Sequence, residues 1–147
     1  MTTQTAFIPF KGRPEPAYGM RCRVYRNLNA PGYFSVLADE GEHKGRVLGY
    51  ARAVTLTNVT FKVQAGGYRR LQAEQVRNVH ASAIGNFKAC GNVPPDRLQK
   101  TGKRISYQPF RQPFFFDRTD PGTPVWDAHE ICAYGADLLV PNLQESQ

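Results

Sequence analysis

Apolar and polar residues alternate along much of this chain, and that alternation is typical of β-strands with one buried face. The first clear example is the stretch in which Cys22 and Val24 alternate with Arg21, Arg23 and Tyr25. Successive side chains of a strand point to opposite faces of the sheet. The pattern therefore predicts a strand whose one face enters a core and whose other face carries charge.

Further alternating stretches follow and are separated by turn-forming residues. A turn at residues 29–32, with proline and glycine, precedes a returning strand at 33–37, so the first two strands form a hairpin. A long alternating segment covers 45–56. A second turn at 57–58 then leads to a strand at 59–63. These stretches predict an antiparallel arrangement in the first half of the chain.

One segment of the chain has the composition of a helix. Residues 68–78 are rich in helix formers and follow two glycines. The other elements expected in the second half are strands at 79–87, 105–109, 114–116 and 125–134, with a turn at 120–124. This order predicts an α+β fold, a mostly antiparallel sheet or half-barrel with one packed helix.

The length of the chain, 147 residues, fits one domain. Prolines and glycines predict an extended N-terminal arm over 1–20, followed by a single globular domain over 21–134 and a C-terminal tail over 135–147. No apolar run approaches the roughly 18 residues that span a bilayer, and the N-terminus lacks the pattern of a signal peptide. We expect a soluble cytoplasmic protein without a membrane partner.

Three cysteines, Cys22, Cys90 and Cys132, lie far apart in the sequence. Their odd number and the lack of a C-x-x-C pair argue against a disulfide framework and against a zinc site. They are interpreted as small core residues in a reducing compartment. We expect no cofactor and no bound metal.

Charge is distributed unevenly along the chain. The net formal charge is +7, and all 19 Lys and Arg residues lie between Lys11 and Arg118 together with seven acids, which leaves +12 in that stretch. Five acids and no base follow Arg118. A basic body favours a polyanionic partner, although charges spread evenly over an ordinary surface would have the same sum.

Basic residues gather on the first strand, on the predicted helix and in the loop before 105. Lys and Arg neutralise phosphates, and aromatic side chains among them stack on bases. The sequence thus predicts a non-catalytic protein that contacts nucleic acid or a ribonucleoprotein, with RNA and DNA both open and the oligomeric state unknown. The phosphate contacts predicted are Arg21, Arg23, Arg69, Arg70, Arg77, Lys100, Lys103 and Arg104. The stacking positions predicted are Tyr25 and Tyr107, against the alternative that most aromatic residues fill the core.

A metal-dependent nuclease is a further hypothesis, and it would use His80 with an acid from elsewhere in the fold. His129 and Glu130 are neighbours in a predicted strand, so their side chains are expected on opposite faces and not in one site. Three aspartates remain as possible metal ligands, namely Asp117, Asp120 and Asp127. No metalloprotease, nucleophile-elbow, P-loop or dinucleotide motif is present, so no catalytic residue is predicted.

Residues 23–36 and 77–81 resemble segments of small proteins from bacteria, their phages and their mobile elements. The resemblance carries no established activity with it. It implies another class of function, because small phage proteins are often inhibitors that occupy a host defence complex, as anti-CRISPR proteins do. Such an inhibitor acts by binding a protein and needs no catalytic residue.

Overall fold

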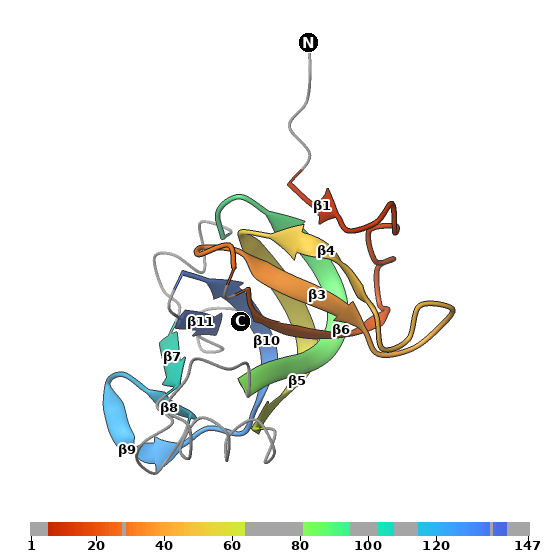
Figure 1. The fold of residues 1–147 in the computed structure, drawn as a ribbon. Coiled ribbons are helices and arrows are strands. Elements are labelled where there is room, and N and C mark those ends of the chain that lie inside the picture. The colour runs from red at the N-terminus through yellow and green to blue at the C-terminus, as the bar shows by residue number, and fades with distance from the viewer. Residues whose placement is uncertain are drawn as a thin grey trace, which may run out of the picture.

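The computed structural model describes residues 6–27, 29–63, 81–94, 103–107, 115–135 and 137–140, and these form strands joined by turns (Figure 1). Within these ranges, eleven strands make one antiparallel sheet. The strands are β1 (Ile8–Pro9), β2 (Arg21–Arg26), β3 (Phe34–Ala38), β4 (Val47–Ala51), β5 (Ala53–Val63), β6 (Ala81–Gly91), β7 (Lys103–Tyr107), β8 (Phe115–Asp117), β9 (Asp120–Pro124), β10 (Asp127–Tyr134) and β11 (Asp137–Val140).

The predicted α+β class is wrong, because the described part of the chain is all-β and holds no helix. The helix predicted at 68–78 lies outside the described residues. The sheet also takes up segments that lack a clear strand pattern, such as β9 and β11. Pairing with neighbouring strands overrides weak local preference, which is why propensity along the chain did not determine the class.

The strand order is β1-β4-β3-β2-β6-β5-β10-β11-β7-β8-β9. The predicted hairpin is confirmed, since β2 pairs antiparallel with β3, and Val24 lies opposite Val36. Long-range pairing then places β6 beside β2 and β10 beside β5. The long strands β5 and β6 curve through the molecule, with β2 to β4 near one end and β7 to β9 near the other (Figure 1).

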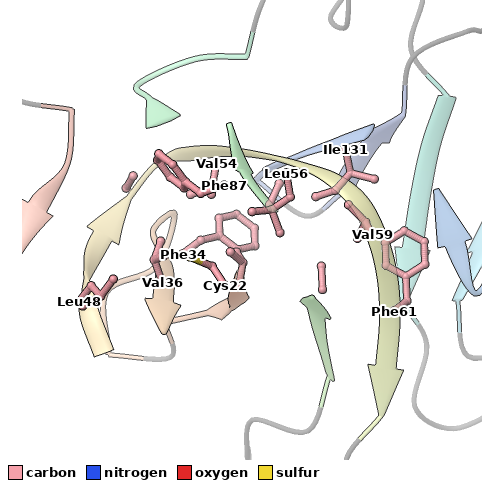
Figure 2. Packing of buried hydrophobic residues seen from close by; sticks show 14 of the residues in the cluster. Cys22, Phe34, Val36, Leu48, Val54, Leu56, Val59, Phe61, Phe87 and Ile131 are labelled. Carbon is pink, nitrogen blue, oxygen red and sulfur yellow. The ribbon is translucent and has the colours of Figure 1, made fainter. Parts of the chain in front are cut away.

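The curved sheet encloses a hydrophobic core on one face, which we call the inner face. Side chains from different strands meet there and point toward one another (Figure 2). Each fully buried aliphatic or aromatic side chain contributes roughly 1.5–3 kcal/mol relative to an exposed one. The largest that are fully buried on this face are Phe7, Leu48, Leu56, Ile131, Val36, Val54 and Val59.

A bulge bends β5 where the sequence predicted a turn. Asn58 has a φ of 51°, and the register with β6 shifts between Thr57 and Thr60. The strand continues through this point because β6 pairs with it on one side and β10 on the other. Gly85 of β6 faces the bulge, and a Cβ there would lie 2.7 Å from the Thr57 carbonyl oxygen. The predicted turn at 57–58 is therefore a bend inside one strand.

A second irregularity lies between β3 and β4. Val36 pairs with Gly49 but Leu37 pairs with Val47, so Leu48 is the extra residue of a bulge. Leu48 turns into the core and is 1% exposed. The alternation predicted over 45–56 is interrupted there and again at Arg52, which separates β4 from β5.

The first strand, β1, pairs with β4 at Tyr50 and Gly49. Phe7, just before it, is 1% exposed and belongs to the core. Its ring occupies the space that a side chain of Gly49 would need, and the Ile8 carbonyl oxygen closes the same space. Residues near the start of the described chain are thus part of the sheet and its core.

The last two short strands correct and extend the sequence analysis. The turn predicted at 120–124 is the edge strand β9, where proline is tolerated because one side of the strand needs no ladder partner. β11 lies in the segment predicted as a tail and pairs with both β10 and β7. Over the described ranges, no helix meets the length and hydropathy that a membrane span requires.

Candidate functional site

The face of the sheet opposite the core, which we call the outer face, carries polar and aromatic side chains. On β2, Cys22 and Val24 are buried in the core. The residues between them, Arg21, Arg23 and Tyr25, are exposed or half-buried and lie on the outer face. The alternation of this strand is as the sequence predicts. Three of the predicted contact residues are therefore on one surface.

An aromatic row crosses the outer face from β1 to β2, and we define it as Phe10, Tyr50 and Tyr25. Tyr25 pairs with Ser35, Ser35 pairs with Tyr50, and Tyr50 pairs with Ile8. The ring of Phe10 meets that of Tyr50 edge-on at 5.8 Å. Because paired residues share a face, these side chains line one continuous strip.

Two cations lie at the β1 end of the aromatic row. The ammonium of Lys11 is 5.3 Å from the Phe10 ring centre, and the guanidinium of Arg13 is 5.6 Å from it. Arg13 also donates a hydrogen bond of 2.9 Å from Nη1 to the Val47 carbonyl oxygen. Lys11 is exposed and Arg13 is half-buried. The aromatic ring and the backbone thus hold two positive charges beside Tyr50.

Tyr25 sits in a mixed environment at the other end of the row. Burial raises the pKa of its phenol, and nearby Tyr50 raises it further. A hydrogen bond with Ser35 and the charge of Arg23 act in the opposite direction. The phenol therefore stays neutral at physiological pH and is available as an apolar ring with one polar tip.

A second row runs beside the aromatic row. Leu37 pairs with Arg23, Arg23 with Ile84, and Ile84 with Thr60. Arg23 is half-buried, and its Nε is fully buried without a hydrogen-bond partner. Arg23 thus lies between Leu37 and Ile84 on the outer face, and its charge acts on the phenol of Tyr25.

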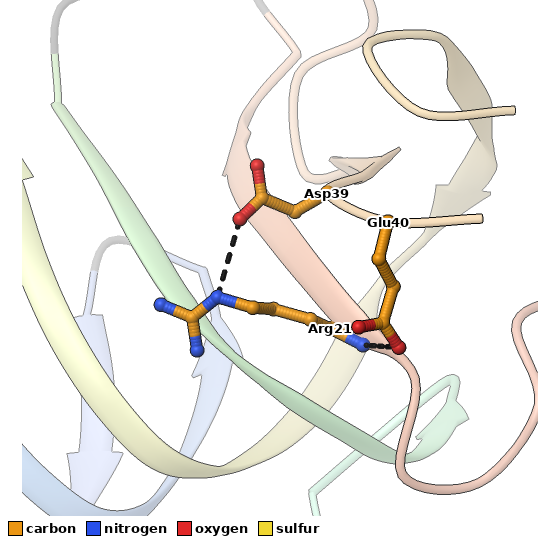
Figure 3. A network of polar contacts seen from close by, with 3 residues as sticks. All are labelled: Arg21, Asp39 and Glu40. Carbon is orange, nitrogen blue, oxygen red and sulfur yellow. Dashed lines mark hydrogen bonds and ion pairs between the residues drawn. The ribbon is translucent and has the colours of Figure 1, made fainter.

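Arg21 already interacts with two acids of the turn that follows β3 (Figure 3). Its Nε lies 3.2 Å from Asp39 Oδ2, and its backbone N–H donates to Glu40 Oε2 at 3.0 Å. An exposed ion pair of this kind contributes about 0.2–1 kcal/mol. Arg21 is thus less free to contact a phosphate than the sequence suggested.

Among the remaining predicted contacts, Arg104 is the one whose side chain the structure describes, and it lies away from this surface. Arg104 lies on β7, which is five strands away from β2 in the sheet order. Neighbouring strands are about 4.8 Å apart, so the two positions are separated by tens of ångströms along the sheet. The structure describes the backbone of Lys103 and Tyr107 but not their side chains. The other predicted contacts lie outside the described residues, namely Arg69, Arg70, Arg77 and Lys100.

The residues of this surface that come from outside β2 were not predicted from the sequence. Phe10, Lys11 and Arg13 lie in the segment predicted as an arm, and Tyr50 lies in a segment whose parity the β4 bulge changes. The one signal present was the order aromatic, basic, glycine, basic at 10–13. Only the pairing of β1 with β4 shows that the residues at 10–13 lie beside Tyr50.

The residues considered for catalysis have other surroundings. His129 is exposed, whereas Glu130 is 7% exposed and its Oε2 lies 3.2 Å from Lys88 Nζ. Asp117 accepts hydrogen bonds from the backbone and the hydroxyl of Thr119, at 2.9 and 2.8 Å. His80 is outside the described residues. Across the part of the chain that the structure describes, no three metal-binding side chains cluster.

All three cysteines are free thiols. Cys22 and Cys132 are buried, and Cys90 is half-buried. Burial, reinforced by Glu40 and Asp39, raises the pKa of Cys22 to about 12. Burial and Glu15 raise the pKa of Cys90 to about 11. Both of these thiols are protonated at neutral pH and therefore weak nucleophiles.

The comparisons with known proteins place this chain among phage proteins. A family model described as "Mycobacterium phage L5 gene 82 protein" matches residues 15–140. The gene 82 protein of Mycobacterium phage L5 is 30% identical to the chain over 107 residues, which are 69% of this chain and 79% of the phage protein. No solved structure matches. The resemblance to proteins of phages and mobile elements is confirmed.

Proposed function

This chain belongs to the family of the Mycobacterium phage L5 gene 82 protein, and we propose that it works as a non-catalytic binding protein for single-stranded nucleic acid. The surface proposed is the outer face around the aromatic row. The tyrosines Tyr25 and Tyr50 would stack on unpaired bases. Lys11, Arg13 and Arg23 would contact the phosphates between those bases.

The observation that carries this proposal is the side-by-side placement of aromatic rings and cations on one solvent-facing sheet surface. Sheet platforms of this composition bind single strands, because every base has a π-face and each stacked base contributes about 1–3 kcal/mol. A duplex hides these faces inside its own stack. The half-buried rings of Tyr25 and Tyr50 therefore support a single strand over a double strand.

The charge of the whole chain supports the same proposal. The net charge of +7 attracts a polyanion over a long range, and the cations at the row then contact it directly. Affinity that comes from phosphate contacts depends little on the base sequence of the nucleic acid. We therefore propose a protein with weak sequence preference, acting in the cytoplasm, where the thiols stay reduced.

The test is a titration of labelled single- and double-stranded RNA and DNA at about 50 and 200 mM salt. We expect saturable binding to single strands, weaker binding to duplexes, and, for the three phosphate contacts named, a loss of affinity of about twentyfold between the two salt concentrations. Absence of single-strand binding at the lower salt concentration would contradict the proposal.

Variants of the aromatic row connect the binding to this surface. We expect Tyr25→Leu and Tyr50→Leu each to weaken single-strand binding about tenfold, because a stacked base loses its ring. Lys11→Gln should lower the salt slope by about 0.7, the value for one contact with a single strand. The matched control is Arg118→Gln, which makes the same charge change near β8, far from the row; it should change affinity less than twofold.

Membership in a phage family favours one alternative, namely an inhibitor that binds a host defence complex. Such a protein would use the same surface against an acidic protein partner. Stoichiometric co-purification of a host protein, together with absent binding to every oligonucleotide, would favour this alternative. Loss of the co-purified protein after treatment with nuclease would instead favour a nucleoprotein target.

A further inference from the structure

Two buried hydrogen-bond donors on the outer face have no partner. They are the Nε of Arg23 on β2 and the hydroxyl of Ser82 on β6, and Ser82 is 7% exposed. Val24 pairs with Ala83, and both of these residues are buried in the core. Arg23 and Ser82 flank this pair, so both lie on the outer face as diagonal neighbours within reach of an arginine side chain.

Unpaired buried donors are rare because they cost free energy. A buried polar group normally has a partner, and one that is left alone loses its hydration without compensation. The penalty is larger for a charged group such as a guanidinium. Two such donors at neighbouring positions form a place where an added acceptor would recover both penalties at once.

The surroundings of these donors favour a negatively charged acceptor. The two rows around them consist of aromatic, apolar, hydroxyl and cationic residues as far as Thr60, whose partner on β10 is the exposed Asp127, and the acids Asp39 and Glu40 already interact with Arg21 in the adjoining turn. A phosphate oxygen is an acceptor without a donor of its own, and it bonds strongly to a guanidinium N–H. A second phosphate oxygen can accept a hydrogen bond from the hydroxyl of Ser82.

We propose that Arg23 and Ser82 together bind one phosphate of a nucleic-acid strand that lies along the aromatic row. This inference rests on the proposed function and adds a specific anchoring site to it. Tyr25 lies next to Arg23 on β2, so a base that stacks on its ring would place its neighbouring phosphate near both donors. Because both donors are covered in the free protein, the side chain of Arg23 has to change rotamer and move outward as the phosphate enters.

The experiment compares Arg23→Lys and Ser82→Ala with the wild type in the titration of single strands. Arg23→Lys keeps the charge and removes the Nε donor, and Ser82→Ala removes only the hydroxyl. We expect each to weaken binding about five- to tenfold, and the double variant to lose less than the product of the two. Arg118→Lys, which makes the same change of side chain near β8, far from the row, is the control and should bind like the wild type.

A folding readout separates loss of the site from loss of structure. Removing an unpaired hydroxyl should leave stability unchanged or raise it slightly, since no hydrogen bond of the free protein is lost. Thermal unfolding of Ser82→Ala at or above the wild-type midpoint, with weakened binding, supports the site. A lowered midpoint would show that Ser82 has a structural partner and would overturn the inference.

The outcomes for the site and for the proposed function are distinct. If single strands bind the wild type and both variants equally well, the phosphate site is wrong and the proposed function stands. If no oligonucleotide binds, the proposed function fails, and inorganic phosphate becomes the probe. A saturable NMR shift of the Arg23 Nε–H with phosphate in the wild type, lost in Ser82→Ala, would then support an anion site, and no shift would rule it out.

Discussion

At the scale of single residues, the thiol of Cys22 illustrates how one side chain responds to the fold around it. Cys22 is fully buried between β3 and β6, while Asp39 and Glu40 lie near enough to act on its charge. Burial first, and then the two carboxylates, raise its pKa from 9.0 to about 12. The folded protein therefore holds this proton to a higher pH than the unfolded chain does.

This shift predicts a loss of stability in alkaline solution. Below about pH 9 the thiol is protonated in both states, and its contribution to folding is fully present. As the pH rises toward 12, the unfolded state loses the proton first and becomes favoured. We expect urea unfolding between pH 8 and 11 to show a steeper decline for the wild type than for Cys22→Ala. Val24→Ala, which opens a cavity without removing a titrating group, is the control and should keep the wild-type slope.

The close approach at Gly49 leads to a second prediction at this scale. A Cβ on Gly49 would overlap the Phe7 ring and the Ile8 carbonyl oxygen, so Gly49→Ala has to push β1 away from β4. Overpacking of this kind costs about 1–3 kcal/mol. We expect urea unfolding to show that loss of stability. Binding of single strands should also weaken, because the Phe10 end of the aromatic row is displaced. Gly122→Ala, where a Cβ meets open space, should leave both unchanged.

At the scale of elements, the bulge of β5 allows one strand to serve two parts of the sheet. Leu56 and Val59 both face the core although they are three positions apart, because Asn58 between them adopts positive φ. The strand pairs with β6 and β10 on either side of this bend. The curvature of the sheet, and with it the enclosure of the core, depends on this local conformation.

The bend predicts opposite effects for two substitutions of Asn58. Asn58→Val should lose about 1–2 kcal/mol in urea unfolding, because a β-branched side chain is strained at a φ of 51°. Asn58→Gly should be neutral or slightly stabilising at the same position. Thr60→Val, two residues along on the same exposed side of the strand, controls for the change of side chain. Equal losses for the valine and glycine variants at position 58 would contradict the conformational explanation.

At the scale of the whole molecule, the sheet is held together by pairing between distant parts of the chain. β5 and β10 are neighbours in the sheet although Leu56 and Ile131 are 75 positions apart, and β2 pairs with β6 across some 60 residues. Forming such contacts costs loop-closure entropy before any burial compensates for it. The fold thus depends on pairings that no local segment can form alone.

This topology predicts slow folding. Two-state proteins dominated by non-local strand pairing fold in milliseconds to seconds, whereas helical bundles of similar stability fold in microseconds to milliseconds. Trp126, the single tryptophan, meets Phe115 edge-on at 6.1 Å and so reports on assembly of the β8 region. We expect stopped-flow refolding followed by its fluorescence in the slower range. A submillisecond main phase would contradict the prediction.

The sequence by itself determined the strand β2, which of its side chains face the core, and its hairpin with β3. Alternation is a direct consequence of strand geometry, so Cys22, Val24 and the charged residues between them were placed correctly without knowledge of the partner strands. The hairpin of β2 and β3 was equally predictable, because a proline-glycine turn joins two neighbouring alternating runs.

Only the tertiary structure decided the class of the fold and the composition of the candidate site. The β4 and β5 bulges change parity at Leu48 and Asn58, and they arise from pairing with particular neighbours. The pairing of β1 with β4 brings Lys11 and Arg13 to Tyr50, about 40 residues away in sequence. The physical reason is the same in each case: local patterns specify strands, whereas register and strand order come from the core and ladder contacts of the assembled sheet.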